Sequence, residues 1–318
     1  MHFLASLLPL ALAISTVAAH DHRQLSHAEI SRRHAASNRC AKRSGEMNER
    51  RIATHKSKRS LAARSTNVTL HLDDYHYTTI QNDTCVLTPE VTTGPYIWHR
   101  SQTLRQDMTE DQTGVPLYLD IGVLDIDTCE PLPNVLVDLW HCNATGSYSS
   151  FDALSPNTPF ETLLTELNKT ITDDLHTGNS TWLRGLWPTD ENGMMEMKTI
   201  FPGFYVERAI HIHVQVHMNW TLANNGTMSN DRTVSTGQLF FAEDLSEEIM
   251  ALQPYASHTQ INRTLNSVDT IYTGGALDNG FNPIMSVAAL DGVDVTNGMV
   301  AYITLGVNTS TTAADSLA

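Results

Sequence analysis

The sequence predicts a mainly β protein with a β-sandwich core, short helices and long loops. Through most of the chain, apolar and polar residues alternate in short runs, and this period of two is typical of strands. Turn residues separate the runs, and only two segments of the body show helical spacing. A chain of 318 residues, 41% of them hydrophobic, is long enough for one sizeable domain or at most two small ones.

Several strands follow from this alternation. Residues 115–127 read VPLYLDIGVLDID, with an apolar residue at every second position from Val115 to Val123. Residues 134–140, NVLVDLW, repeat the pattern after a turn that contains two prolines. Near the C-terminus, VDVTNGMVAYITLGV carries an Asn-Gly pair at 297–298 between two apolar runs, which predicts a β-hairpin.

Two helices are predicted between these strands. In residues 159–175, PFETLLTELNKTITDDL, the apolar residues recur at helical spacing. Residues 243–255, EDLSEEIMALQPY, open with Asp244 followed by Glu247, which is the spacing of a capping box. Both segments are expected to pack against an edge of the sandwich.

The segment YVERAIHIHVQVH, residues 205–217, predicts a strand with two different faces. Isoleucine and valine occupy one face, and His211, His213, Gln215 and His217 occupy the other, since strand side chains alternate. The first face should join the core, and the second is available for chemistry. The Cα atoms of His211 and His213 should lie about 7 Å apart, so both rings can reach one metal ion, whereas His217 lies about 13 Å beyond His213.

Charge divides the chain into two parts. The net charge is −15, but 12 of the 20 Lys and Arg residues and only 4 of the 35 acids precede residue 65. The remainder therefore has 8 bases and 31 acids, a net charge of −23, and should repel nucleic acid and anionic membranes.

The N-terminal part reads as targeting and processing sequence. Residues 1–19 are apolar and end in small residues, which predicts a signal peptide, with a signal anchor as the alternative. Residues 20–65 form a basic arm with dibasic pairs at 42–43 and 58–59, so it is either a pro-segment cut there or an uncut helical arm. No later stretch is long and apolar enough to span a bilayer, and residues 309–318 are predicted to be a flexible tail.

Sequons and cysteines support an oxidising, secretory route. Sequons for N-glycosylation begin at Asn67, Asn82, Asn143, Asn168, Asn179, Asn219, Asn225, Asn262 and Asn308. The four cysteines show no C-x-x-C spacing, which favours disulfides. Of the three possible pairings we favour Cys129 with Cys142, because both sit beside predicted strand ends and the loop between them is short. Cys40 would then pair with Cys85 and tie the arm to the body.

The H-x-H pair alone is weak support for a metal site. A zinc hydrolase would need a third histidine or a carboxylate and an open water position. The nearby carboxylate is Glu207, and the sequence contains no H-E-x-x-H. The other concentration of polar and aromatic residues is DLWHCNATGSYSS, residues 138–150, which ends a predicted strand with a turn around Gly146 and Tyr148.

Two separated motifs carry a family resemblance. PNVLVDLWHCNATGSYS, followed by RGLWPTDENGMMEMKTIFPGFYVERAIHIHVQV, resembles the intradiol ring-cleavage dioxygenases, in particular their secreted fungal branch. The resemblance runs from about residue 85 to 241, roughly half of the chain, and makes residues 66–308 the expected catalytic domain. It implies a mononuclear non-haem iron site whose ligands are Tyr148, Tyr205, His211 and His213.

Further residues follow from the same resemblance. Tyr205 would be displaced by the substrate and accept one of its protons, Arg208 would stabilise negative charge on the reacting groups, and Gln238 would contribute a hydrogen bond. Tyr96, Trp140 and His141 would line the pocket, with core packing as the alternative. Only five residues separate Tyr205 from His211, fewer than in the intracellular catechol enzymes, so the pocket should differ in shape.

The ligand types fit that chemistry. Two phenolates and two imidazoles form a mixed oxygen and nitrogen set that favours Fe(III), whereas two histidines with one carboxylate are typical of ferrous oxygenases. The expected cofactor is therefore one Fe(III) ion per chain, and the expected partners are a small aromatic diol and O2, with cis,cis-muconate-type products. The preferred diol, whether catechol, hydroxyquinol or protocatechuate, is left open by the sequence, as is the oligomeric state.

Two alternatives belong to other functional classes. One is a non-catalytic β-sandwich binding module, which intact iron ligands argue against. The other is a zinc or copper enzyme that uses the same histidines and tyrosines, which metal analysis would separate from an iron enzyme.

Overall fold

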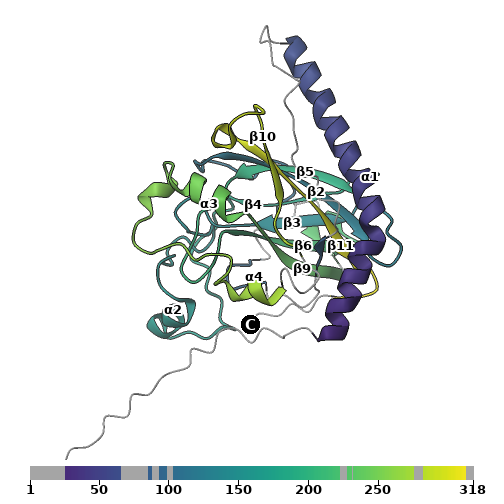
Figure 1. The fold of residues 1–318 in the computed structure, drawn as a ribbon. Coiled ribbons are helices and arrows are strands. Elements are labelled where there is room, and N and C mark those ends of the chain that lie inside the picture. The colour runs from purple at the N-terminus through teal and green to yellow at the C-terminus, as the bar shows by residue number, and fades with distance from the viewer. Residues whose placement is uncertain are drawn as a thin grey trace, which may run out of the picture.

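The structure is a computed structural model that describes residues 26–65, 85–87, 93–98, 103–222, 228–230, 232–275 and 282–312, with the backbone alone for 54–65. The predicted signal peptide and the sequons at Asn67, Asn82 and Asn225 lie outside these residues. Strands dominate the body and short helices flank them (Figure 1). The predicted mainly β fold is therefore confirmed.

Two sheets form the sandwich. The first has the order β1-β11-β2-β5, with β10 also paired to β11, and the second has the order β4-β3-β6-β9. The strands of the first sheet are β1 (Cys85–Val86), β2 (Pro116–Asp125), β5 (Met194–Ile200), β10 (Ser286–Ala289) and β11 (Met299–Val307). Those of the second are β3 (Leu136–Trp140), β4 (Arg184–Pro188), β6 (His211–Met218) and β9 (Arg232–Phe240). A separate pair, β7 (Thr221–Leu222) and β8 (Met228–Ser229), follows β6.

The main hydrophobic core lies between the two sheets. It receives the alternate apolar residues of β2 from one sheet and Ile212, Val214 and Val216 of β6 from the other. Since side chains alternate along a strand, this orientation sends His211 and His213 to the opposite face of the second sheet. That face is also covered, so β6 is buried on both sides.

Helix α1 (His27–Ser65) covers the outer face of the first sheet and turns the sandwich into three layers. It lies along one side of the strands and its C-terminal end projects past them (Figure 1). Most of its buried residues are small or polar, and Met47 is the one large hydrophobic side chain among them: Arg33, Ala36, Ser37, Cys40, Ser44, Met47, Asn48 and Arg51. The basic arm is therefore helical, as expected for the second of its two interpretations. Cleavage at the dibasic pairs stays a prediction.

The predicted disulfides are wrong. Cys40 of α1 is joined to Cys129, with Cα atoms 5.1 Å apart, and Cys85 and Cys142 are buried thiols. The whole of β3 lies between Cys129 and Cys142, and strand residues rise about 3.3 Å each, so these two cysteines fall at opposite ends of the sheet. The expected tether between the arm and the body is nevertheless present, through a different partner.

Two local predictions need correction. The first helix, α2 (Phe160–Leu167), stops well before residue 175 because Asn168 adopts a left-handed conformation with φ 51°. Helix α3 (Glu243–Met250) has Ala242 at its N-cap and no side-chain capping bond, so the capping box does not form. Asp244 instead lies in the first turn, where its charge favours the helix dipole.

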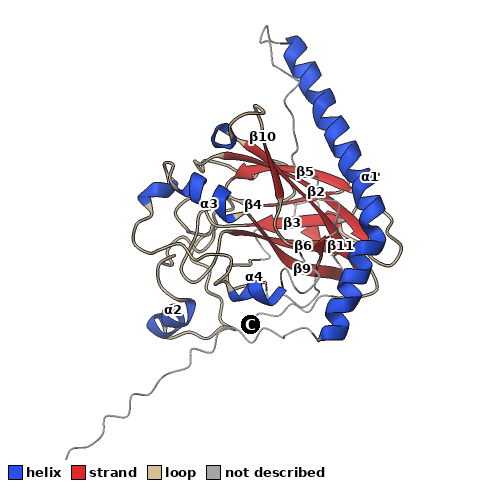
Figure 2. Cartoon of the chain, in the orientation of Figure 1, coloured by secondary structure: helices blue, strands red, loops and turns tan. Residues whose placement is uncertain are grey.

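The C-terminal hairpin also differs from the prediction. β11 does pair with an antiparallel neighbour, but that strand is β10, and residues 295–297 form a short 3₁₀ turn. Another 3₁₀ turn (Tyr255–Ser257) and helix α4 (Thr270–Gly275) complete the elements. Helices α2 and α3 lie on the side of the strands opposite α1 (Figure 2). Among the described helices, none combines the length and apolarity needed to cross a membrane.

Side-chain environments differ among the sequons that the structure describes. Asn168, Asn179, Asn219 and Asn262 are exposed. Asn143 is half-buried, and its amide oxygen accepts hydrogen bonds from the backbone of Thr145 and Ser147 at 3.1 and 3.0 Å. Asn143 is therefore a poor acceptor for a glycan.

Candidate active site

The site begins with the two histidines at the start of β6. His211 Nε2 and His213 Nε2 lie 3.1 Å apart, and both side chains are buried. His211 Nδ1 donates to the carbonyl of Ala209 at 2.7 Å, which leaves Nε2 with its lone pair directed toward the shared centre. Trp140 stacks parallel to the His213 ring with a centroid distance of 4.8 Å. These contacts fix the orientation of both rings.

A tight turn brings Tyr148 to the histidines. Gly146 has φ +90°, and an added Cβ there would lie 2.3 Å from the carbonyl oxygen of Phe204. Likewise, a Cβ at Gly203 would meet the carbonyl oxygen of Ala144 at 2.5 Å. The two loops that carry Tyr148 and Tyr205 can therefore pack backbone to backbone. Tyr148 Oη then lies 3.1 Å from His213 Nε2.

Tyr205 enters from a turn just before β6. The Arg208 amide donates to the Tyr205 carbonyl at 3.3 Å, and Glu207 has φ 66°. The turn places the Tyr205 hydroxyl 3.4 Å from His211 Nε2 and 3.4 Å from an Arg208 nitrogen. Glu207 itself is exposed, so the nearby carboxylate stays outside the site.

Burial sets the protonation of these four groups. It lowers the pKa of His211 and His213, an effect reinforced by neighbouring Arg208 and, for His213, by His211. It raises the pKa of Tyr148 and that of Tyr205, the latter to about 12 although Arg208 opposes the shift. The imidazoles are therefore neutral and the phenols protonated at neutral pH. A phenolate form requires a strongly charged cation nearby.

The donor set fits an iron ion. Successive donor atoms are 3.1 to 3.4 Å apart, which is the separation of neighbouring ligands bound at about 2 Å to one metal. Within the described ranges no three His, Cys, Asp or Glu side chains gather as a metal-binding group. The atoms that surround the histidine pair are phenol oxygens, and this hard, anionic set suits Fe(III).

Arg208 and Gln238 form a polar wall beside the donors. Arg208 donates to the side-chain oxygen of Gln238 and, from Nε, to Asp269 Oδ2 at 2.8 Å. Burial opposes the charge on Arg208, but the Asp269 carboxylate raises its pKa above the ordinary value. Gln238 pairs with His213 across the strands, and its amide nitrogen is buried without a hydrogen-bond partner in the described part of the chain. That N–H group is available to a bound molecule.

Other residues considered from the sequence lie outside the donor cluster. His217 faces Asp138 and Thr233, at 3.5 Å and 2.9 Å, further along β6. His141 bonds Thr199 Oγ1 at 2.7 Å, so it has a packing role. Tyr96 is buried and stacks on Tyr148 with a centroid distance of 4.7 Å.

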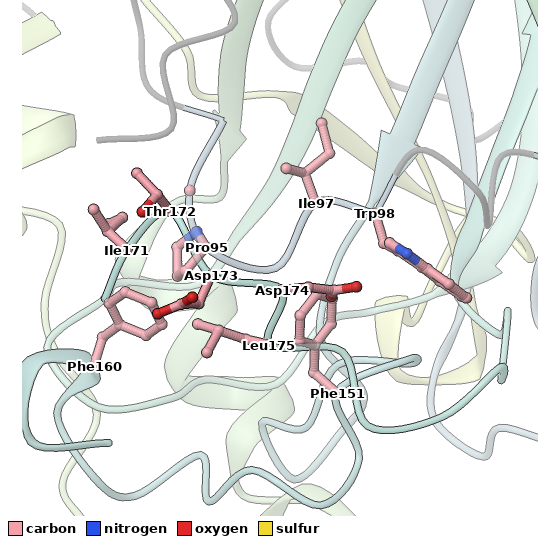
Figure 3. Close-up of a pocket in the computed structure, with 11 residues that line it drawn as sticks. Pro95, Ile97, Trp98, Phe151, Phe160, Ile171, Thr172, Asp173, Asp174 and Leu175 are labelled. Atoms are coloured by element: carbon pink, nitrogen blue, oxygen red, sulfur yellow. The ribbon is translucent and has the colours of Figure 1, made fainter. Parts of the chain in front are cut away.

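A largely apolar cavity lies beside Tyr96. Its volume is about 220 Å³, and apolar and aromatic side chains surround it, with two aspartates nearby (Figure 3). The lining residues are Gly94, Pro95, Ile97, Trp98, Phe151, Phe160, Ile171, Thr172, Asp173, Asp174 and Leu175. An added Cβ on Gly94 would lie 3.2 Å from His213 Cε1, so the cavity adjoins the donor cluster. Its size suits a molecule smaller than the usual drug-sized ligand.

Two buried charged residues that contact the site carry no signal in the sequence. Arg184, buried on β4, donates to the carbonyls of Tyr96 and Ser149 at 2.7 and 2.8 Å and so joins two loops of the site. Asp269 holds Arg208 from a segment 61 residues further along the chain. In the sequence both residues look like ordinary surface charges, because only the fold brings them to their hydrogen-bond partners.

Comparison with known proteins gives one consistent family. The family model described as Dioxygenase matches residues 91–245. A catechol 1,2-dioxygenase from Acinetobacter baylyi is 30% identical over 122 residues, which make up 37% of this chain and 32% of that protein. The match thus spans about a third of that relative's length.

Solved structures agree in fold. An intradiol ring-cleavage dioxygenase from Tetranychus urticae superposes with a TM-score of 0.58 at 26% identity, over 74% of this chain and 100% of that chain. A second structure, described as a dioxygenase, gives a TM-score of 0.56 at 26% identity with the same coverage.

Proposed function

Because the chain belongs to the intradiol ring-cleavage dioxygenase family, we propose that it uses one non-haem Fe(III) ion and O2 to cleave a catechol-type ring between its two hydroxyl-bearing carbons. The products would be of the cis,cis-muconate type. The observation that carries the proposal is the convergence of two phenol oxygens and two imidazole nitrogens, 3.1 to 3.4 Å apart, in a buried site.

Each protein group then has a defined task. When bound, Fe(III) supplies the charge that holds both diol oxygens and makes the ring reactive toward O2. Tyr148, His211 and His213 are the fixed ligands. Tyr205 is the ligand that accepts a proton from a substrate hydroxyl, and its hydroxyl lies 3.4 Å from His211 Nε2. Arg208, 3.4 Å from the Tyr205 hydroxyl, stabilises negative charge on the substrate.

Substrate size follows from the cavity. Its apolar walls have room for a single aromatic ring. The amide nitrogen of Gln238, which has no hydrogen-bond partner among the described residues, donates a hydrogen bond to a polar group beside the metal. The Acinetobacter relative is a catechol 1,2-dioxygenase, which supports a simple catechol as the first substrate to test.

The cellular setting forms part of the same proposal. Residues 1–19 direct secretion, residues 66–308 form the catalytic domain, and the exposed sequons carry glycans, as expected for a secreted fungal member of the family. The Cys40–Cys129 disulfide supports an oxidising compartment.

The test begins with metal analysis and the visible spectrum of the purified protein. Iron, and a broad tyrosinate-to-Fe(III) band that shifts when catechol is added without O2, would support the ligand set. Admission of O2 should then produce a muconate, identified by absorbance and mass. Tyr148→Phe should lose most of the band, whereas Tyr118→Phe, a change at a partly exposed tyrosine on β2, should keep it.

Other outcomes separate the alternatives. Zinc or copper in place of iron would support the alternative enzyme classes. A protein that stays colourless after Fe(III) reconstitution, and that does not consume O2 with catechol, hydroxyquinol or protocatechuate, would refute the dioxygenase proposal and favour a binding module.

A further inference from the structure

Asp269 is a fully buried carboxylate at the edge of the site, outside the residues that the family model matches. One oxygen, Oδ2, accepts from Arg208 Nε and from the backbone N–H of Ala209, both at 2.8 Å. The other, Oδ1, accepts from the backbone N–H groups of Ile271 and Tyr272 at 2.8 and 3.0 Å, at the start of α4. All four contacts are N–H donors, so the site is built for a carboxylate.

The two donors on Oδ2 lead directly into the active site. Arg208 reaches the Tyr205 hydroxyl at 3.4 Å and the Gln238 side chain with the other nitrogens of its guanidinium. Ala209 holds His211 through its own carbonyl, which accepts from His211 Nδ1 at 2.7 Å. One carboxylate therefore fixes both the cation beside Tyr205 and the backbone that orients His211.

The electrostatics agree with this arrangement. Burial alone would raise the pKa of Asp269, but the Arg208 guanidinium and the N–H donors hold it below its ordinary value. Asp269 therefore stays ionised, and Arg208 remains charged although little of its side chain is exposed. A planar guanidinium bound at Nε keeps its two terminal nitrogens directed at other partners.

We propose that Asp269 is a positioning residue for ring cleavage. Through Arg208 it holds a positive charge beside Tyr205, and through the Ala209 backbone it fixes the orientation of His211. This inference rests on the proposed function. It assigns a role to the segment that leads into α4, whose Tyr272 packs against Phe240 of the second sheet.

The competing explanation is that Asp269 merely caps α4. Asp269→Asn separates the two roles, because asparagine is also a good N-cap and can keep its oxygen on Ile271 and Tyr272. Its amide nitrogen would then face Arg208 and Ala209, which are both donors. Asp269→Ser is the second variant, since serine also caps helices but cannot reach the guanidinium. The matched control is Asp125→Asn, a change at a buried carboxylate that caps a turn after β2.

The first readout uses the metal-free protein. In wild type, the ¹H–¹⁵N signal of Arg208 Nε should be resolved and slow to exchange with water. We expect it to be lost or averaged in Asp269→Asn and Asp269→Ser and retained in Asp125→Asn. A resolved, protected Arg208 signal in both Asp269 variants would overturn the proposal, and this result would not depend on whether the protein is a dioxygenase.

The second readout uses the iron-loaded enzyme. Misplacing a catalytic group by about 1 Å can cost about 100-fold in rate, so we expect kcat to fall about 10- to 100-fold while KM changes less than about threefold. In an Arg208→Ala background, Asp269→Asn should lower kcat by a smaller factor, because only the contact with the Ala209 backbone is then left to lose. A loss of kcat by the same factor in both backgrounds would show that Asp269 does not act through Arg208 and would overturn the proposal.

Discussion

Replacing Arg51 with methionine tests whether α1 is an integral layer of the fold. Arg51 Nε lies 2.7 Å from Asp120 Oδ1 on β2, and the two side chains are only 2% and 5% exposed. Another guanidinium nitrogen donates to the carbonyl of Ile303 on β11 at 3.2 Å, and the guanidinium lies 5.4 Å from the Tyr302 ring centre. Arg51→Met fills much of the same volume but removes the charge and the donors.

The expected cost is large because the carboxylate stays buried. Removing one partner of a buried ion pair typically costs about 3–5 kcal/mol, most of it from the charge left behind. For a domain of this size, each kcal/mol lowers Tm by about 2–4 °C, so Tm should fall by about 6–20 °C. Replacing Asp120 with leucine in the same variant should recover much of the loss, since no buried charge then remains.

The assay is thermal and urea denaturation of the full chain with its disulfide intact. The neighbouring Arg50 provides the control: it is exposed and bonded to Asn192 Oδ1 at 2.9 Å, so Arg50→Met should cost less than about 1 kcal/mol. If Arg51→Met cost as little as Arg50→Met, α1 would not be docked on the sheet in solution. The conclusion that α1 forms a third layer on the first sheet would then be refuted.

Three further predictions concern the tether, a buried histidine and a turn. Cys40→Ser should lower the free energy of unfolding by about 2–5 kcal/mol, because the disulfide to Cys129 closes a loop with a sequence separation of 89; equal thermal stability would contradict this. Burial lowers the pKa of His141 to about 4, so the folded protein favours the neutral imidazole. The resulting stabilisation, at most about 3 kcal/mol, is complete above about pH 6.5 and is lost as the pH falls toward 4. His141→Gln should flatten the stability profile between these pH values, and an unchanged slope in urea titrations would argue against the assignment. Gly146→Ala should destabilise the protein by about 2 kcal/mol or more and weaken iron binding, since the added Cβ would meet a carbonyl oxygen at 2.3 Å and φ is +90°. Gly178→Ala, with no described atom within 4 Å of the added carbon, is the control, and equal melting temperatures for the two variants would disprove the close approach.

Local sequence patterns gave the parts of the fold that depend on neighbouring residues. The alternation along β2, β3 and β6 predicted strands at nearly their observed positions, because the strand period is a property of the backbone. On β6 it also separated Ile212 in the core from His211 and His213 on the opposite face. The residue types of the four proposed ligands were likewise readable from two motifs.

Patterns failed where a contact joins distant segments. The pairing of Cys40 with Cys129 could not be predicted, because it depends on which sheet face α1 covers and on which end of β3 each cysteine falls. The docking face of α1 has mostly small and polar residues, with Met47 as its one large hydrophobic side chain, so the sequence of α1 shows no continuous hydrophobic stripe. A buried Arg51 gains its partners only once β2 and β11 lie beneath the helix.

By itself, the sequence determined the β architecture, the two faces of the histidine strand and the donor types available to a metal. Only the tertiary structure decided which of these groups meet. Tyr148 and Tyr205 converge because two glycine-containing loops pack backbone to backbone, and Asp269 reaches Arg208 from a segment far along the chain. Side-chain periodicity is set by bond geometry within a few residues. Contacts between residues that are distant in the sequence depend on the path of the whole chain and on the packing that fixes this path.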